Sequence, residues 1–346
     1  MKKSQKNKRK NWMKWTIASV LVSVLAVGGL SYGLTRLTAR NGKKIQKQYL
    51  LLNEIAYPNI EYTTWGWEPT SNFSGKFYSN RIKDVDGITI PFIKYEGEYS
   101  IFHHYDLNQD EALRTGDDGK SDYTYQENYK IPRFYDVLEN ENVFYKQKQD
   151  LDFIPDMTNQ AVEVAITFDE GYTLEEISKM IPDSLKMNWI WIGVGKQGFV
   201  NGNLAYQYGF TPHFDQGLTA EQQNAMTKEV NQALTKNSKA EVAKIYRKYE
   251  QEQKVTPLVG MQNSFTIFAD NAQKFLAMRG DESDSKELVA LKDFLAQNKD
   301  AVTAKFAGVI LTGRAENFAQ LKDVKWIFAS NIGQSVEIQP YHHLEK

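Results

Sequence analysis

Residues 161–194 read AVEVAITFDEGYTLEEISKMIPDSLKMNWIWIGV, a pattern typical of a strand, a helix and a second strand. The first strand is predicted because apolar side chains occupy every second position from Val162 to Phe168, which places them on one face. Thr173 and Glu176 are spaced as a capping box, in which each side chain satisfies a free amide at the helix start. The second strand is predicted from the alternation of Leu185, Met187, Trp189 and Trp191.

A shorter version of this pattern lies near the C-terminus, where residues 306–311 are apolar, Gly313 interrupts them and residues 314–321 favour a short helix. An alternating strand follows, formed by Val324, Trp326 and Phe328. Two βαβ units of this kind predict a ferredoxin-like α+β sandwich. Roughly 110 residues separate the halves, whereas connections are normally short, so we expect a helical insertion at about 217–300.

The composition is that of a folded protein, with 41% hydrophobic and 25% charged residues in a chain of 346. Residues 1–44 hold eleven Lys and Arg and no acid, which leaves −12 on the other 302 residues of a chain whose net charge is −1. A body this acidic is a poor nucleic-acid binder. The absence of cysteine excludes disulfides, thiolate metal sites, a cysteine nucleophile and a lipoprotein anchor.

The uncharged residues 15–34 are long enough to cross a bilayer as a helix. Trp12 and Trp15 lie where aromatic residues gather at the membrane interface. The alternative is a cleaved signal peptide, but its apolar region is usually shorter, and the best cleavage site, residues 37–39 before Arg40, is poor. We therefore expect a retained transmembrane helix in contact with membrane lipid.

Positive charge flanks this helix unequally, with seven Lys and Arg in residues 1–14 and five from Arg36 to Lys47. The excess predicts a cytoplasmic N-terminal tail and an extracytoplasmic body in a single-pass cell-membrane protein. Gly29 and Gly33 form a G-x-x-x-G pair, a spacing that allows two membrane helices to approach closely. A homodimer through these glycines is one candidate arrangement.

Residues 35–125 are expected to hold a helical stalk at 43–55 and then a strand-rich region, because Tyr, Trp, Phe, Thr and Gly dominate residues 57–102. The polar, acidic residues 106–122 are expected to form a loop. The α+β domain is expected over residues 126–346, although no Gly/Ser-rich or Pro-rich linker marks its start.

The insertion contains several predicted helices. Thr219 and Gln222 form a capping box for a helix that ends near Thr235. Apolar periodicity predicts three more, at residues 239–253, 271–278 and 286–297. Residues 195–216 are rich in Gly, Asn, Tyr and Phe and are expected to form a long loop or hairpin.

A G-x-G-x-x-G motif at residues 193–198 follows a predicted strand. A dinucleotide site needs a helix to begin there, so that its amides hold the pyrophosphate. The sequence continues instead with Phe199-Val-Asn-Gly-Asn, which is turn chemistry, so a glycine-rich loop is predicted.

Asp106, Asn108 and Asp110 stand at positions 1, 3 and 5 of a possible calcium loop. Glu111 occupies the position that needs glycine, and Asp117 replaces the bidentate Glu. A solvated polar loop is therefore favoured over a surface cation.

The histidines do not form a metal site by sequence. His103 and His104 are adjacent and would face opposite sides of a strand. His213 has Asp215 nearby but no obvious third ligand, and the remaining pair lies in the polar tail, at His342 and His343.

Other motifs also have structural explanations. Residues 283–286 match S-x-x-K without the companion motifs of serine acyl-enzymes, and Ser283 or Ser285 suits a helix cap. The carboxylate pairs 169–170 and 175–176 fit a turn and a first helical turn. Core packing is favoured for three tryptophans, Trp189, Trp191 and Trp326. We predict a non-enzymatic protein with no catalytic, cofactor-binding or metal-binding residue.

A set of short motifs follows the basic-flanked span and stalk in a fixed order. These motifs are Tyr57-Pro58-Asn59-Ile60, Phe134-Tyr135-Asp136, residues 162–169, Tyr172-Thr173 with Glu176, Asn188-Trp189-Ile190-Trp191, Tyr208-Gly209-Phe210 and residues 306–313. They extend over nearly the whole chain beyond the membrane. In their order and spacing the chain resembles the paired N-terminal and C-terminal sigma-factor-regulator domains of Gram-positive membrane anti-sigma factors.

The resemblance implies a membrane-anchored regulator in extracytoplasmic-function sigma-factor signalling. Only about fourteen residues precede the span, fewer than a folded sigma-binding domain needs. We therefore expect signalling through a second membrane protein, such as a membrane anti-sigma partner. The alternative is an exported ligand-binding or cell-wall protein, or a cell-wall enzyme, that keeps the fold without the regulatory role.

Overall fold

The computed structural model describes residues 2–103, 113–116, 121–124, 127–135, 148–194, 204–214, 220–236, 238–253, 255–279 and 285–346. The chain forms two compact units. Unit 1 comprises Met1–Tyr49, Thr64–Asn80 and Lys94–Leu107. Unit 2 comprises Leu50–Thr63, Arg81–Ile93 and Asn108–Lys346.

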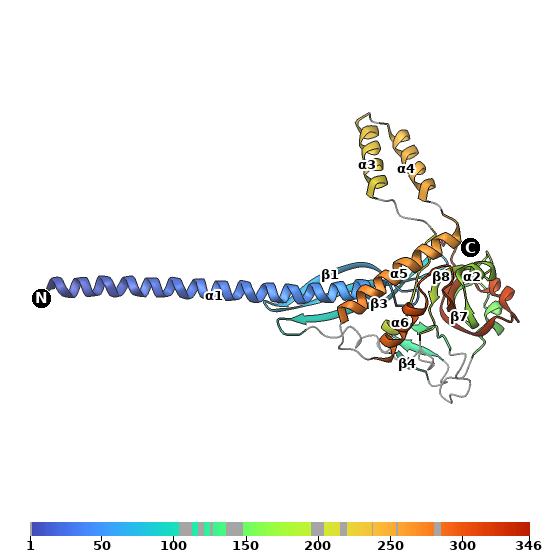
Figure 1. Ribbon diagram of the computed structural model, residues 1–346, viewed down its shortest axis with the longest axis horizontal. Helices are drawn as coiled ribbons and strands as arrows, with labels where there is room; N and C mark the ends of the chain where they lie inside the picture. Colours follow the sequence, from blue (N-terminus) through green and yellow to red (C-terminus); the bar gives the residue numbers. More distant parts are fainter. Residues whose placement is uncertain are drawn as a thin grey trace. The chain divides into compact units, whose positions relative to one another are not determined.

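The first element, α1 (Lys2–Asn53), is one continuous helix (Figure 1). Its residues 12–33 are all exposed, although most are apolar. Among the described residues, α1 is the one helix long and apolar enough to cross a membrane. The stalk expected at 43–55 is not a separate helix. Residues 35–53 contain no proline, and a lone glycine such as Gly42 costs a helix only about 1 kcal/mol. Nothing in this segment therefore ends the helix before Asn53.

Three long strands follow α1 and form a sheet in the order β1-β2-β3. Their bounds are β1 (Glu61–Ser71), β2 (Ser74–Val85) and β3 (Ile88–Ser100). Within unit 1, the sheet lies along one side of α1, where Thr38, Gly42, Ile45 and Tyr49 form a buried stripe. The ring of Tyr49 stacks on Tyr95 of β3 at 4.3 Å between centroids. The strand-rich region expected here is present.

Unit 2 is built on a second sheet, in which every neighbouring pair of strands is antiparallel. Its order is β11 (Ile327–Glu337), β7 (Gln160–Tyr172), β10 (Phe306–Arg314), β8 (Lys186–Trp191) and β9 (Gly209–Phe210). A small sheet is formed by β4 (Leu113–Thr115), β5 (Asp122–Thr124) and β6 (Lys130–Ile131). The chain is therefore α+β, as predicted. β4 and the start of β5 fall within residues 106–122, which were expected to form only a loop.

Strand β7 is buried on both faces, whereas its alternating pattern predicted one buried face. The apolar set from Val162 to Phe168 lies on one side as expected. The other side carries Glu163, Ala165 and Thr167, which are also buried, because a buried lysine neutralises the glutamate. In the register with β10, Val309 pairs with Ile166, so the two sequence halves share one core as expected.

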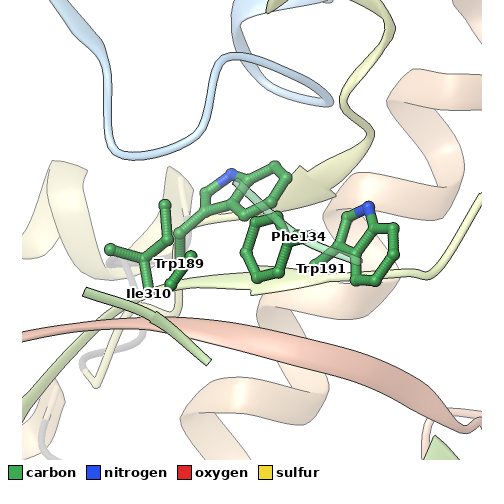
Figure 2. Packing of buried hydrophobic residues seen from close by; sticks show 5 residues of the cluster. Phe134, Trp189, Trp191 and Ile310 are labelled. Atoms are coloured by element: carbon green, nitrogen blue, oxygen red, sulfur yellow. The ribbon is translucent and has the colours of Figure 1, made fainter. Parts of the chain in front are cut away.

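Strand β8 departs from simple alternation at Asn188. Its register with β10 skips this residue, because Ile310 pairs with Trp189 while the next residue, Leu311, pairs with Met187. A bulge of this kind changes which face the flanking side chains occupy. The prediction that Met187 shares a face with Trp189 and Trp191 is therefore wrong. The two tryptophans are buried as core residues, and Phe134 packs beside them, stacked 4.7 Å from Trp191 (Figure 2).

The helices largely follow the sequence. The helix after β7 is α2 (Leu174–Met180), and its capping box is confirmed: Thr173 Oγ1 accepts from the Glu176 amide at 3.3 Å, and the Glu176 carboxylate accepts from the Thr173 amide at 2.8 Å. The later helices are α3 (Ala220–Thr235), α4 (Lys239–Gln253), α5 (Pro257–Arg279) and α6 (Lys286–Gln297).

Helix α5 is longer than the predicted segment 271–278. It starts at Pro257, a residue favoured at the first helical position because its fixed φ suits a helix start. Phe265 on α5 packs 5.3 Å from Phe306 of β10 and 6.0 Å from Phe210 of β9, measured between ring centroids. This aromatic contact secures α5 on the sheet of unit 2.

Short 3₁₀ helices complete the described fold: η2 (Asp150–Asp152), η3 (Ile154–Asp156), η4 (Leu204–Tyr206) and η6 (Ala315–Leu321). The helix expected at 314–321 is thus a 3₁₀ helix. The strand expected from Val324 begins only at Ile327, because the chain turns at Asp323, whose φ is 60°.

Candidate functional site

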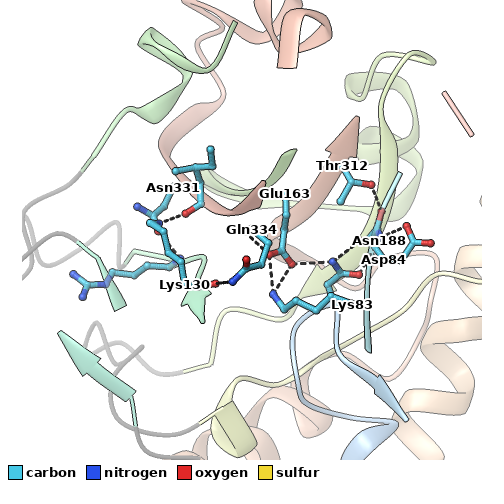
Figure 3. Close-up of polar contacts among 11 residues, drawn as sticks. Lys83, Asp84, Lys130, Glu163, Asn188, Thr312, Asn331 and Gln334 are labelled. Carbon is cyan, nitrogen blue, oxygen red and sulfur yellow. Dashed lines mark hydrogen bonds and ion pairs between the residues drawn. The ribbon is translucent and has the colours of Figure 1, made fainter. Parts of the chain in front are cut away.

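A buried ion pair joins β2 to β7 inside unit 2. Lys83 Nζ lies 2.7 Å from both carboxylate oxygens of Glu163, and both side chains are fully buried. The Asn59 side chain donates to the same carboxylate at 2.8 Å, and the backbone amide of Gln334 donates at 3.1 Å. Figure 3 shows Lys83 and Gln334 on either side of the Glu163 carboxylate. Several donors of this kind are what a buried carboxylate requires to remain charged.

Further hydrogen bonds extend the pair into a chain of buried polar groups, which we call the polar latch. Asn188 donates to Asn59 Oδ1 at 2.9 Å and accepts from Thr312 Oγ1 at 2.7 Å. Thr312 in turn accepts from the Asp86 amide at 3.0 Å. The polar latch therefore comprises Asn59, Lys83, Asp86, Glu163, Asn188, Thr312 and Gln334.

Local backbone geometry places these groups. Asn59 and Asp86 have φ of 51° and 56°, in the left-handed region that asparagine and aspartate tolerate better than most residues. Gly333 permits β11 to approach Glu163, since a Cβ there would lie 2.3 Å from Glu163 Oε2. The bulge in β8 supplies the extra residue, Asn188, that reaches both Asn59 and Thr312.

The electrostatics of the polar latch favour a structural role over a catalytic one. Burial lowers the pKa of Lys83, and the neighbouring Glu163 charge opposes this shift. Four hydrogen bonds, two of them from Lys83, already occupy the Glu163 carboxylate. A carboxylate saturated in this way is a poor general base, because its lone pairs are not free to take a proton.

A second buried polar cluster lies beside the latch in unit 2. Arg133 forms a two-point ion pair with Asp122, and its backbone amide donates to Asn331 Oδ1 at 2.9 Å. Asn331 donates to Asp150 at 3.2 Å, and the Ile332 amide donates to the same oxygen at 2.9 Å. This cluster connects β5, η2 and β11, and so secures the edge of the main sheet.

A small pocket of about 180 Å³ lies at the end of α1 within unit 2. Its polar walls include Glu54, His213 and Ser264, and its apolar walls include Phe210 and Phe268. Partial burial raises the pKa of Glu54, while His213 opposes the shift. A wider groove of about 710 Å³ shares the His213 wall. The small pocket offers a carboxylate, an imidazole and aromatic surface to a small ligand.

Of the candidate metal-ligating residues that the structure describes, His213 lines this pocket. In the G-x-G-x-x-G segment only Gly193 and Val194 are described. The rest of that segment lies outside the described residues, and so do the five residues of the calcium-like pattern. The same holds for three other candidates, His104, Asp215 and Ser283. His103 and His343 are exposed, and His342 accepts a bond from the Gln339 amide at 3.1 Å. Among the described residues, no group of three or more His, Cys, Asp or Glu side chains could hold a metal ion.

Ser285 and the pair 175–176 have the structural roles that were expected, whereas the pair 169–170, expected at a turn, lies in β7. Ser285 caps α6 by accepting from the Leu288 amide at 3.3 Å. Glu175 forms an ion pair with Lys179 at 2.6 Å, one turn along α2. Lys83, which helps build the polar latch, belonged to none of the sequence motifs. Asn188 belongs to the motif Asn188-Trp189-Ile190-Trp191, but nothing in that motif indicated its buried hydrogen bonds to Asn59 and Thr312.

These features define a class: an α+β protein with one candidate membrane-spanning helix and a body locked by buried polar groups. Residues 2–90 match the family model described as sigma factor regulator N-terminal, and residues 154–334 match the one described as sigma factor regulator C-terminal. The chain therefore belongs to the sigma factor regulator family, which confirms the resemblance. No curated protein and no solved structure matches it.

The polar latch joins the two matched segments. Asn59, Lys83 and Asp86 come from the first, and their partners from Glu163 onward come from the second. Because each side supplies groups that the other needs when buried, neither segment can complete this part of the core alone.

Proposed function

We propose that this chain is a membrane-anchored extracytoplasmic regulator that modulates extracytoplasmic-function sigma-factor signalling. Membership of the sigma factor regulator family supports a sigma-factor system as its partner. The basic residues 1–14 and the acidic body support an N-terminus inside the cell and a body outside. The body acts by binding, and in support of this the buried ion pair of the polar latch, Lys83 with Glu163, is held in structural bonds.

The main support for a signalling role is the continuity of α1 into the core of unit 2. Its last residues, Leu50–Asn53, belong to that unit, and Leu52 is 2% exposed. The chain just beyond is fixed as well, because Ile55 is fully buried and its carbonyl accepts from the Gly209 amide at 2.9 Å. A change in the body that moves this anchor also moves the helix that carries the span.

A helix break between the span and the anchor tests this coupling. Arg36→Pro removes a backbone donor from exposed helix and costs the helix about 3 kcal/mol. Arg36→Ala is the matched control, because it removes the same charge and keeps the helix. We expect transcripts under the cognate sigma factor to change as in a deletion strain for Arg36→Pro only, at equal protein level in the membrane. Normal regulation by Arg36→Pro would contradict coupling through α1.

A membrane partner that contacts the sigma factor is part of this proposal. Regulation should then depend on the body and the span more than on the sequence of residues 2–14. Replacing residues 2–14 by an unrelated basic segment should leave sigma-dependent transcription near normal, and deleting residues 155–346 should alter it. If the replacement alone abolishes regulation, the basic tail is itself the effector.

Two finer features are proposed with it. The order β11-β7-β10-β8 with antiparallel neighbours, and a helix after β7 and after β10, supports a ferredoxin-like description of the sheet. In the span, a Cβ added at Gly29 or Gly33 would have no atom within 4 Å, so this surface is open to a second helix. Loss of a crosslinked dimer in Gly29→Leu, with Gly28→Leu as the control, would support pairing through the G-x-x-x-G face.

The small pocket favours a second candidate function, an exported ligand-binding protein. Its carboxylate, imidazole and aromatic walls suit a small polar ligand with an apolar part. The two functions differ in their genomic neighbours: a sigma-factor gene beside this one supports the regulator, and transport or wall-synthesis genes support the binding protein.

A further inference from the structure

The end of the β-sheet in unit 1 lies close to the end of the membrane span. Along α1, Tyr49 stacks on Tyr95, and a Cβ on Gly97 would lie 3.2 Å from Ile45. Farther toward the span, Asn41 Nδ2 donates to the carbonyls of Ser100 and Ile101 at 2.9 and 3.0 Å. Strand β3 therefore runs along α1 toward the N-terminal part of that helix, as Figure 1 also shows.

The chain turns at this point and exposes Phe102, with Phe73 and Ile101 half-buried beside it. The Ser100 amide donates to the His103 carbonyl at 2.7 Å, which closes a turn, and Phe102 in that turn is 82% exposed. The turn between β1 and β2 lies alongside, since the Ile101 amide donates to the Phe73 carbonyl at 3.2 Å. We call Phe73, Ile101 and Phe102 the apolar tip.

Helix geometry gives the distance along α1 between the end of the candidate span and the apolar tip. The uncharged span ends at Leu34, and Asn41 is seven residues farther on, about 10 Å along the axis. The protein covers α1 down to Thr38, only about 6 Å beyond the span. The headgroup region occupies roughly 5–8 Å on each side of the hydrocarbon core, so an aromatic side chain at the tip reaches it.

Basic side chains near the apolar tip are suited to contact with anionic lipid headgroups. Arg36 is exposed on α1 between the span and the sheet, and three more basic residues are exposed on α1 beside the end of the sheet: Arg40, Lys43 and Lys44. Basic side chains near a bilayer are attracted to anionic headgroups, and aromatic side chains favour the interface. From this juxtaposition we infer that the apolar tip seats in the headgroup region of the bilayer and is a second membrane contact beside the span. The inference rests on the proposed anchoring by α1.

The absence of cysteine permits a direct test. Single-cysteine variants Phe102→Cys, Glu98→Cys and Leu25→Cys of the full chain are labelled with a fluorophore and placed in nanodiscs containing phosphatidylglycerol. Quenching by doxyl-labelled lipid and by aqueous iodide is then compared. Glu98 is the matched control, because it is exposed on β3 four residues before Phe102 and lies nearer the level of Ile45. Leu25 reports the span.

We expect strong lipid quenching at positions 25 and 102, and iodide access at 102 at least threefold below that at 98. Equal iodide access at 102 and 98, with position 25 shielded, would overturn the tip contact and leave the anchor intact. Iodide access at position 25 would overturn the anchor itself. Shielding at 102 without lipid quenching would mean that protein covers the tip, which also rejects the inference.

The variant Phe102→Cys removes the side chain whose membrane contact is being tested, so a second pair of variants carries the label elsewhere. With the label at Phe73→Cys, Phe102→Glu should lower lipid quenching at least twofold, because a carboxylate is costly to seat at the interface. Phe102→Leu should keep it. Equal quenching in both variants would contradict a role for Phe102, and the circular dichroism spectrum checks that both are folded.

Discussion

Glu163 places a negative charge inside a central strand, where an unpaired carboxylate would cost far more than a surface charge. Lys83 balances it at 2.7 Å, and Asn59 and the Gln334 amide occupy its remaining acceptor sites. Breaking a buried pair from one side is therefore costly, whereas replacing both partners by apolar groups of similar volume is often neutral.

We predict that Glu163→Gln, which leaves the Lys83 charge buried without its counter-charge, lowers the free energy of unfolding by about 3–5 kcal/mol. The double variant Lys83→Met with Glu163→Leu should recover much of this loss. Tryptophan fluorescence during urea unfolding of the solubilised chain measures both. If the free energy of unfolding of Glu163→Gln falls by less than about 1 kcal/mol, the ion pair contributes no more than a solvent-exposed pair does. That result would contradict the buried ion pair of the polar latch.

Asp86 makes stability depend on pH. Burial raises the pKa of its carboxyl from 3.8 to about 6, against hydrogen bonds from the Lys346 and Glu345 backbone. Because the folded chain holds this proton more tightly than the unfolded chain, the contribution to stability is full below 3.8 and is lost as the pH rises to about 6.

Asp86→Asn should therefore match the wild-type Tm near pH 4 and exceed it above pH 6, since asparagine also tolerates the left-handed φ. Asp183→Asn, at an exposed position, is the control and should follow the wild-type profile. Thermal melts from pH 4 to 8 measure the difference. Parallel curves for Asp86→Asn and wild type would refute the assignment.

Elements with local signals could be predicted, and those set by distant contacts could not. The capping box of α2 is contained in Thr173–Glu176, so the sequence was sufficient. The bulge at Asn188 was not predictable, because its partners Asn59 and Thr312 lie more than a hundred residues away in either direction. For the same reason the sequence did not reveal Lys83 and Glu163 as a pair. It predicted the strand of Glu163, but for Lys83 only a strand-rich region over residues 57–102.

At the level of the sheet, β7 and β10 form one core from two distant parts of the chain. Val164 is fully buried and pairs with Leu311. Val164→Asp should bury an unpaired charge, cost about 3 kcal/mol or more and unfold β10 and β11 together with β7. Hydrogen exchange on the solubilised chain would show protection lost in all three strands. Independent melting of fragments 155–195 and 300–335 would contradict a shared core.

For the whole molecule, the uneven positive charge predicts one crossing with the body outside. Protease added to intact protoplasts should degrade the body and leave a small protected fragment that contains residues 15–34. An antibody against a tag at the N-terminus would detect the fragment. A body that survives until the membrane is lysed would reverse the orientation.

The polar latch also determines when the protein can finish folding. Glu163 receives its last donor from Gln334, roughly 250 residues after Lys83, and ribosomes add about 5–20 residues per second. Lys83 and the open strand around it thus wait roughly 12–50 s in every new chain before the final donor exists. During that interval the charge of Lys83, which is buried in the finished protein, is exposed to solvent. The unfinished body therefore needs protection from proteases and from association with other unfinished chains.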